Sequence, residues 1–328
     1  MSGGSVTASP RTDHPGASER TDSRGRGGRR PWAGFGYLLI IYIVWGTTYL
    51  AVRIGVREGS GFPPFTFGWS RLLAAGAVFL IISWLRRRRL PRDPRAILSS
   101  GGAGLLMWTG AFGINAWALQ LLDSSYAAIS MGAIPIWGAL LEGFLDRESP
   151  SRGLIASLAV GLGGVACLAL PELMRSPPSS YGPLIGLLFS PLLWAAGAIL
   201  QTRGGGGIDL FAGIGYQKLI GSLGLLLLTV AFREPLPRAS ADAWWAWAYI
   251  LVFGSLIAFA AFMKVLRMLP ARIVMTYAFV NPAIASLVGH VVLGERLEVT
   301  DLAGMSLIAV GVAGALRERI RWQRRRAD

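Results

Sequence analysis

The feature that most constrains this chain is a series of ten apolar blocks, each close in length to a membrane-spanning helix. An α-helix needs about 20 apolar residues to cross the hydrocarbon core of a bilayer. The composition agrees, because 53% of the residues are apolar and 15% are charged, whereas soluble domains carry about 25% charged residues. We therefore expect an all-α integral membrane protein with ten transmembrane helices, at residues 36–56, 64–85, 97–119, 124–145, 152–171, 183–201, 209–231, 244–266, 271–293 and 299–317.

Basic residues are unevenly divided between the two sides of the predicted membrane. From Arg24 onward, 22 of them fall in segments on the side of the N-terminus and 6 fall in the connectors opposite. Cytosolic segments of membrane proteins are enriched in Lys and Arg, so the sequence predicts a multi-pass protein of the cytoplasmic (inner) membrane with both termini in the cytosol. Residues 1–31 lack an apolar pattern and are expected to form a disordered cytosolic tail, and residues 318–328 a basic cytosolic tail.

An internal repeat divides the apolar region into two halves, residues 36–171 and 183–317. A shift of 147 residues aligns Leu119 with Leu266 and Pro135 with Pro282 without a gap. Each half then holds five helices, and an odd number places the second half in the membrane with the opposite orientation. Inverted repeats are typical of secondary transporters, in which exchange between two like halves gives alternating access to one site near the midplane.

Two cations are predicted near the middle of membrane spans, at positions that the repeat relates. Lys218 follows Arg71 by 147 residues. A charge at the bilayer centre costs at least about 2.5 kcal/mol, so each cation needs a compensating partner. The sequence predicts a pair of cations that face a cavity and bind a carboxylate or phosphate. The alternative is structural, with each cation bonded to backbone carbonyls or reaching the interface, or with Arg71 ordering the helix bundle.

Further polar and aromatic residues of the spans are candidates for the lining of a substrate cavity. Prolines at matched positions, Ile134-Pro135 and Asn281-Pro282, are expected to interrupt helices there, and broken helices are typical of transporter binding sites. The alternative is a packing kink. The candidates beside Arg71 and Lys218 are Trp45, Thr47, Thr48, Trp108, Asn115, Trp117, Gln217, Tyr277 and Asn281.

Glu142 and His290 are the candidates for coupling transport to protons. Glu142 lies one turn from the cytosolic end of the fourth span, close to Arg147. An ion pair with a connector arginine, or hydration at the interface, is the favoured interpretation, and a protonatable coupling carboxylate is the alternative. His290 lies at the far end of the ninth span, and histidine is the residue type that most readily changes charge near neutral pH, although a lone interfacial histidine is more often a bystander.

Several function classes are excluded by what the chain contains. One cysteine, Cys167, and two histidines provide neither a disulfide framework nor the roughly four ligands of a structural zinc site. Arg203 is followed by four glycines but not by the Lys-Ser/Thr of a phosphate-binding loop. The basic excess lies in tails and connectors, so nucleic acid is not an expected partner. No cofactor is expected, and a membrane enzyme acting on lipid-linked substrates, the alternative from another class, would need clustered acidic, histidine or nucleophilic residues at one membrane face.

Several motifs carry a resemblance to a known family. The first span reads Ile-Val-Trp-Gly-Thr-Thr-Tyr-Leu-Ala-Val-Arg at 43–53, the second opens Pro-Pro-Phe at 63–65, and the ninth reads Tyr-Ala-Phe-Val-Asn-Pro-Ala at 277–283, followed by Leu-Gly-Glu at 293–295. These resemble the EamA-domain exporters of the drug/metabolite transporter superfamily over residues 36 to 317. The resemblance implies a ten-helix inverted-repeat exporter of amino acids, metabolites or drugs.

Two departures from the family pattern limit what is carried over. Lys218 stands where the family more often has an uncharged residue, and the first repeat reads Asp-Arg-Glu at 146–148 rather than Gly-Glu. Substrate identity is therefore not inherited. The sequence predicts a secondary transporter that exports small metabolites, such as amino acids or related anionic or zwitterionic compounds, or drugs, by alternating access. The alternative within transport is efflux of lipophilic cations through Glu142 and the aromatic residues.

Overall fold

The computed structural model describes residues 31–86, 93–147, 151–175, 181–204, 208–265, 268, 274, 277–294 and 298–327. Residues 1–30 of the predicted tail, the connector 87–92, Glu148 and Glu295 lie outside these residues.

All regular secondary structure in the described part of the chain is helical. Three rods are built from helices that follow one another closely, α3–η1–α4, α5–α6 and α10–η3–α11, where η1 and η3 are stretches of π-helix. The helices are α1 (Pro31–Val56), α2 (Pro64–Leu85), α3 (Pro94–Gly104), η1 (Leu105–Phe112), α4 (Gly113–Ala118), α5 (Ser124–Met131), α6 (Ile134–Leu145), α7 (Arg152–Arg175), α8 (Tyr181–Gly204), α9 (Leu210–Ala231), α10 (Ala241–Tyr249), η3 (Ile250–Ala258), α11 (Phe259–Val265), α13 (Tyr277–Leu293) and α14 (Val299–Ala327).

Among the described residues, seven helical stretches are long and apolar enough to cross a membrane. The other three expected spans correspond to α7, α13 and α14, and the described parts of α7 and α14 include shorter apolar stretches at Arg152–Gly161 and Val299–Gly311. Helix α14 continues to Ala327, ten residues beyond the predicted end of the last span, so the predicted C-terminal tail is largely helical. The seven stretches are Gly34–Val56, Pro64–Leu85, Pro94–Ala118, Tyr126–Leu145, Tyr181–Gln201, Leu210–Ala231 and Ala241–Val265.

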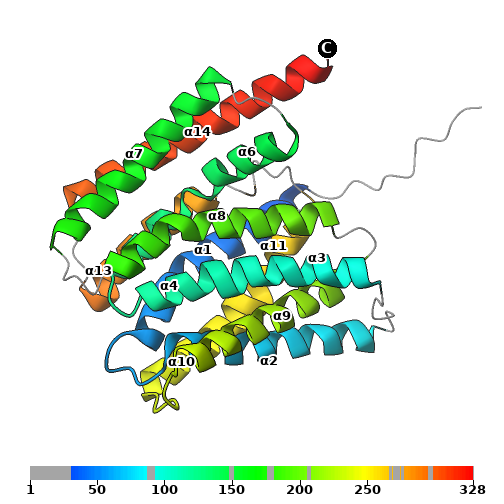
Figure 1. The fold of residues 1–328 in the computed structure, drawn as a ribbon, viewed down its shortest axis with the longest axis vertical. Coiled ribbons are helices and arrows are strands. Elements are labelled where there is room, and N and C mark those ends of the chain that lie inside the picture. Colours follow the sequence, from blue (N-terminus) through cyan, green and yellow to red (C-terminus); the bar gives the residue numbers. More distant parts are fainter. Residues whose placement is uncertain are drawn as a thin grey trace, which may run out of the picture. The chain divides into compact units, whose positions relative to one another are not determined.

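Helices α2 and α9 form one closely packed pair, and α7 and α14 lie side by side as another (Figure 1). Glycines permit the close approach. A Cβ atom added to Gly76 of α2 would lie 2.8 Å from the side chain of Leu219, and one added to Gly311 of α14 would lie 2.6 Å from the backbone of Gly161. The pair formed by α2 and α9 carries both Arg71 and Lys218, so this packing sets where the two cations lie.

Two carboxylates that flank α9, Asp209 before it and Glu234 after it, fix the ends of this pair. Glu234 accepts hydrogen bonds from the backbone N–H groups of Phe65, at 2.8 Å, and Thr66, at 2.7 Å, in the first turn of α2. At the start of α9, the Asp209 carboxylate accepts from the N–H of Phe211 at 3.1 Å and from the hydroxyl of Ser83 at 3.1 Å. These carboxylates satisfy backbone donors that a helix start leaves free, and a negative charge there is stabilised by the helix dipole.

Of the two helix interruptions that the sequence predicted at prolines, the structure shows one. The fourth predicted span is interrupted at Gly132 and Ala133, where α5 ends and α6 begins with Pro135 in its first turn. Proline is favoured there because the first helical residues need no intrahelical N–H bond. The backbone of α13, by contrast, is helical without a break from Tyr277 to Leu293, so the expected interruption at Asn281-Pro282 is wrong.

Candidate functional site

A cavity of about 100 Å³ lies among helices of both predicted halves. A space of this size has room for several water molecules. Its lining is mainly apolar and aromatic, with a few polar groups and one cation, which is the usual make-up of a small-molecule site. The lining residues are Trp45, Thr48, Tyr49, Val52, Arg71, Trp108, Phe112, Asn115, Leu119, Met131, Ile134, Trp194, Ile250, Gly254 and Tyr277.

Arg71 of α2 brings a buried positive charge to this cavity. Only 2% of the residue is exposed, and its Nη1 donates a hydrogen bond to the hydroxyl of Ser255 on η3. The guanidinium carbon lies 4.5 Å from the ring centre of Phe112 and 5.8 Å from that of Trp108. Its Nε and Nη2 have no hydrogen-bond partner, and no ion pair to Arg71 is found among the described residues. Two nitrogen atoms of this cavity-lining guanidinium are therefore without a hydrogen-bond acceptor.

Lys218 of α9 is also fully buried, but it is not part of the cavity lining. Its Nζ lies 3.9 Å from the ring centre of Trp108 and 4.2 Å from that of Phe259, with no hydrogen-bond partner. Aromatic faces attract cations through their quadrupole. The sequence predicted that both cations would face the cavity. In this structure Arg71 lines the cavity and Lys218 does not, and Lys218 packs against Trp108, which is itself a lining residue.

Asn115 lines the cavity as part of a polar contact between two helices. Its Nδ2 donates to the carbonyl of Ala111 at 2.8 Å and to the hydroxyl of Ser190 on α8. Ser190 in turn donates to the same carbonyl at 3.1 Å. The Oδ1 atom of Asn115 is buried and has no hydrogen-bond partner. Among the cavity-lining residues, Asn115 therefore has an unused acceptor and Arg71 has unused donors.

Trp45 stands at the centre of an aromatic cluster along the cavity. Its ring lies 5.1 Å from Tyr277, 5.0 Å from Phe262 and 6.0 Å from Trp194, measured between ring centres. Thr48, about one helical turn after Trp45, lines the cavity, and its hydroxyl donates to the Trp45 carbonyl at 2.7 Å. These three predicted residues, Trp45, Thr48 and Tyr277, therefore share one wall.

Other predicted residues lie away from the cavity. Gln217 is fully buried and donates from Nε2 to the sulfur of Met107 at 3.2 Å. Trp117 packs in the core near α8, where a Cβ atom added to Gly182 would lie 3.0 Å from its ring. Asn281 is buried on α13 with no hydrogen-bond partner for Oδ1, and Thr47 bonds to its own helix through the Val44 carbonyl at 2.9 Å. None of these residues lines the cavity.

The two coupling candidates are also outside the lining. Glu142 is partly buried in the last turn of α6, and His290 is exposed in the last turn of α13.

Comparisons with known proteins agree with this architecture. Residues 32–170 and 182–317 each match the EamA-like transporter family. The chain belongs to the EamA-like transporter family. It is 29% identical to the inner membrane transporter YedA of Escherichia coli strain K12, over 85% of this chain and 89% of that protein. It is 23% identical to the transporter YoaV of Bacillus subtilis strain 168, over 84% of this chain and 94% of that protein.

A solved structure supports the fold. A crystal structure aligns with a TM-score of 0.62 at 19% sequence identity, covering 88% of this chain and 97% of the other. Family, relatives and apolar helices together identify this chain as a multi-pass membrane transporter and not an enzyme.

Sequence reasoning missed several residues of the site in this EamA-family transporter. Ser255, Ser190, Phe112 and Tyr49 were not among the candidates, yet Ser255 and Ser190 hold Arg71 and Asn115. For Ser255 a signal was present, because it follows Trp108 by 147 residues, the spacing that separates Arg71 from Lys218. Each cation thus contacts the same repeat position of the other half.

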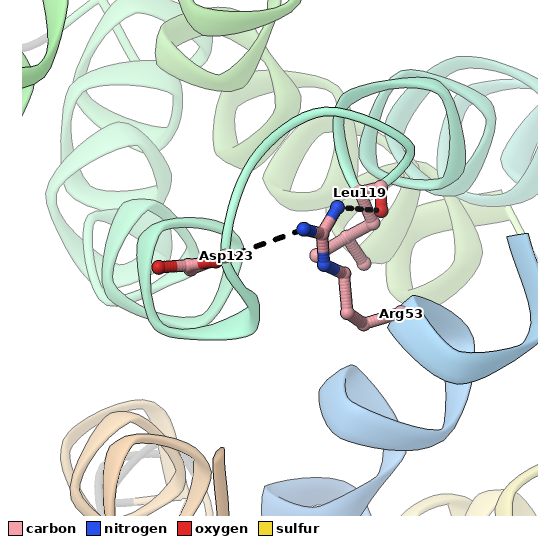
Figure 2. Close-up of polar contacts among 3 residues, drawn as sticks. All are labelled: Arg53, Leu119 and Asp123. Atoms are coloured by element: carbon pink, nitrogen blue, oxygen red, sulfur yellow. Dashed lines mark hydrogen bonds and ion pairs between the residues drawn. The ribbon is translucent and has the colours of Figure 1, made fainter. Parts of the chain in front are cut away.

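A polar contact between α1 and the α4–α5 connector lies next to two cavity-lining residues. Figure 2 shows the guanidinium of Arg53 between Leu119 and Asp123. Its Nη1 donates to the Leu119 carbonyl at 2.9 Å, and its Nη2 lies 3.7 Å from Asp123 Oδ1. Val52 and Leu119 both line the cavity, so the Arg53 contact links α1 to the end of α4 beside these two lining residues.

Proposed function

We propose that this transporter exports small molecules that carry a carboxylate, amino acids or related anionic or zwitterionic metabolites, across the cytoplasmic membrane by alternating access. The observation that carries the proposal is Arg71, a buried cavity-lining residue with two guanidinium nitrogens that have no hydrogen-bond partner. Buried polar groups are nearly always hydrogen-bonded, and a guanidinium matches a carboxylate with paired donors. A bound carboxylate would compensate the charge and accept the free N–H groups.

Efflux of lipophilic cations is the weaker alternative. The aromatic rings at Trp45, Trp108 and Trp194 suit a cation. A second positive charge beside Arg71 in a low-dielectric site would be repelled, however, and like charges disfavour each other strongly there. Glu142, which that mechanism would use, does not line the cavity.

The proposed architecture is ten transmembrane helices in two inverted repeats, residues 36–171 and 183–317, with both termini in the cytosol. Two observations support it. Arg71 reaches Ser255 and Lys218 reaches Trp108, and these pairs are related by the same 147-residue spacing. The π-helical stretches η1 and η3 also fall in the third helix of each proposed repeat. Such stretches are frequent at functional sites.

Coupling to protons is part of the proposal, with Glu142 and His290 as the candidate groups. A carboxylate near the membrane interface can be hydrated and is not obliged to relay protons, so we expect Glu142→Gln to reduce transport by less than about tenfold. Transport measured with and without a pH gradient tests this. Loss of proton-driven transport with retained counterflow would instead assign the coupling to Glu142.

The test of the proposed substrate class is counterflow in proteoliposomes with a panel of radiolabelled amino acids, monocarboxylates and lipophilic cations. Arg71→Met should lower the affinity for carboxylate substrates by about ten- to a hundredfold, the range expected for lost hydrogen bonds to a charged group. Arg71→Lys, which keeps the charge but not the paired donors, should retain part of that affinity. Unchanged carboxylate transport in a well-folded Arg71→Met variant would refute the proposal, and transport of cations alone would establish the alternative.

A further inference from the structure

Trp108 is a cavity-lining residue that also packs against a second cation. Its ring is part of the cavity lining. The Nζ of Lys218 lies 3.9 Å from its centre, and the guanidinium carbon of Arg71 lies 5.8 Å from it. Lys218 is fully buried, with Phe259 at 4.2 Å as its other aromatic neighbour. One indole ring therefore contacts both cations while only one of them reaches the cavity.

The repeat counterpart of Trp108 has the opposite effect on the other cation. That counterpart is Ser255, which follows Trp108 by 147 residues. Ser255 is small and bonds Nη1 of Arg71 while leaving Nη2 and Nε of the guanidinium without partners at the cavity. A serine at one position leaves its cation open, and a tryptophan at the equivalent position covers the other. The difference in side-chain size accounts for the asymmetry between Arg71 and Lys218.

We propose that Trp108 is the charge-selectivity residue of this transporter: by covering Lys218 it limits the cavity to the single positive charge of Arg71. The inference rests on the proposed function and narrows its substrate class. A cavity with one cation suits ligands with a single carboxylate, including zwitterions, whereas two uncovered cations would favour dicarboxylates or phosphate esters. The faces of Trp108 and Phe259, rather than the ligand, stabilise the buried side chain of Lys218.

Whether Trp108 shields position 218 from the cavity is tested first by thiol labelling, which needs no transported substrate. In a Cys167→Ser background, the thiol introduced by Lys218→Cys should be protected from 2-sulfonatoethyl methanethiosulfonate in open membrane preparations. Adding Trp108→Ser, the residue of the repeat counterpart, should speed its modification by at least about tenfold, because the ring that separates it from the cavity is gone. Trp108→Phe keeps a ring there and should leave the thiol largely protected.

The charge of the cavity is tested with a reporter thiol at Thr48→Cys, again in the Cys167→Ser background and with Lys218 intact. The readout is the modification rate by the anionic sulfonatoethyl reagent divided by the rate by the cationic trimethylammonioethyl reagent. Trp108→Ser should raise this ratio at least about threefold, since an uncovered cation in a low-dielectric cavity attracts anions. Adding Lys218→Met to Trp108→Ser should return the ratio to the parent value, and Lys218→Met alone should change it little.

The outcomes separate this inference from the proposed function. If a thiol at position 218 is labelled equally fast with tryptophan and with serine at position 108, Trp108 does not shield that position and the inference is wrong. A charge ratio that rises equally in the Trp108→Ser and Trp108→Ser/Lys218→Met variants would also overturn it, because the gain would then come from cavity size. If Trp108→Ser does not reach the membrane at parent abundance, Trp108→Leu serves in both assays. If the labelling follows the predicted pattern but the protein transports no carboxylate, the proposed function alone is refuted.

Discussion

Ser255 is the residue that fixes the guanidinium of Arg71 in the cavity. It is fully buried on η3 and accepts the hydrogen bond from Nη1. We expect Ser255→Ala to lower the affinity for a carboxylate substrate by about tenfold, since a hydrogen bond to a charged group contributes about 1.5 kcal/mol or more. Counterflow at graded substrate concentrations measures this.

The matched control is Ser222→Ala. Ser222 is a buried serine of α9 that is not part of the cavity lining. Equal losses of affinity in the two variants would mean that the effect is general destabilisation and not the position of Arg71.

At this scale the sequence predicted the depth of the charged residues better than their surroundings. Arg71 and Lys218 were recognised as buried cations because a charge inside an apolar span has few explanations. The depth of a residue along its helix does not, however, show how the neighbouring helices are rotated about their axes. In our proposal, the separation of Lys218 from the cavity depends on its contact with Trp108, which joins two spans far apart in sequence. For the same reason Gln217, adjacent to Lys218, was predicted for a cavity that it does not line.

At the scale of elements, Glu234 fastens the α9–α10 connector to the start of α2. Both carboxylate oxygens are used, because Thr66 also donates from its hydroxyl at 2.7 Å. Replacing the charge by an amide puts N–H donors against N–H donors, so Glu234→Gln should reduce the free energy of unfolding by about 1–3 kcal/mol. Thermal unfolding of the purified protein in detergent measures this as a lower Tm.

Glu58→Gln is the control for that prediction. Glu58 is exposed near the start of the α1–α2 connection, and loss of an exposed charge should change stability by less than about 0.5 kcal/mol. Comparable destabilisation by both variants would contradict the role assigned to Glu234.

Two glycines of the α1–α2 connector have left-handed backbone, but only one of them lies close to another segment. Gly59 has φ 81° with no atom within 4 Å of an added Cβ, whereas Gly61 has φ 72° and its Cβ would meet the Arg238 carbonyl oxygen. Left-handed backbone costs a non-glycine residue about 1–2 kcal/mol. Gly61→Ala should therefore destabilise the protein by that amount plus the cost of displacing the α9–α10 connector.

The comparison with Gly59→Ala in thermal unfolding isolates the second contribution. Equal decreases in Tm for the two variants would show that the close approach to Arg238 is relieved at no cost.

Elements were predictable where one residue type dictates the backbone. The start of α2 at Pro64 and the break before Pro135 follow from proline lacking an N–H donor. The same rule failed at Pro282, where α13 remains helical. Nothing in the local sequence of η1 or η3 predicted π-helix, because that geometry depends on how a rod packs between its neighbours rather than on residue preference.

At the scale of the whole molecule, the cavity depends on both halves of the chain at once. Arg71 and Asn115 come from the first half, and their partners Ser255 and Ser190 come from the second. A cavity wall shared in this way has to change when the halves move relative to each other, as alternating access requires. The contact of Arg53 with Leu119 and Asp123, by comparison, lies within the first half.

The proposed orientation predicts the result of reporter fusions. Fusions at residue 90 and after residue 320 should report the cytosol, and fusions near residues 60, 175 and 236 should report the exterior, from the division of 22 basic residues against 6. The fold adds an independent constraint. The N–H of Arg238 donates to the Gly61 carbonyl at 2.8 Å, and the N–H of Ser240 donates to the Ser60 carbonyl at 2.9 Å. Residues 60 and 236 must therefore report the same side, whichever side that is. Opposite signals at these two positions would refute the ten-helix arrangement, and a cytosolic signal at both, with exterior signals at 90 and 320, would reverse the orientation while leaving the helix count in place.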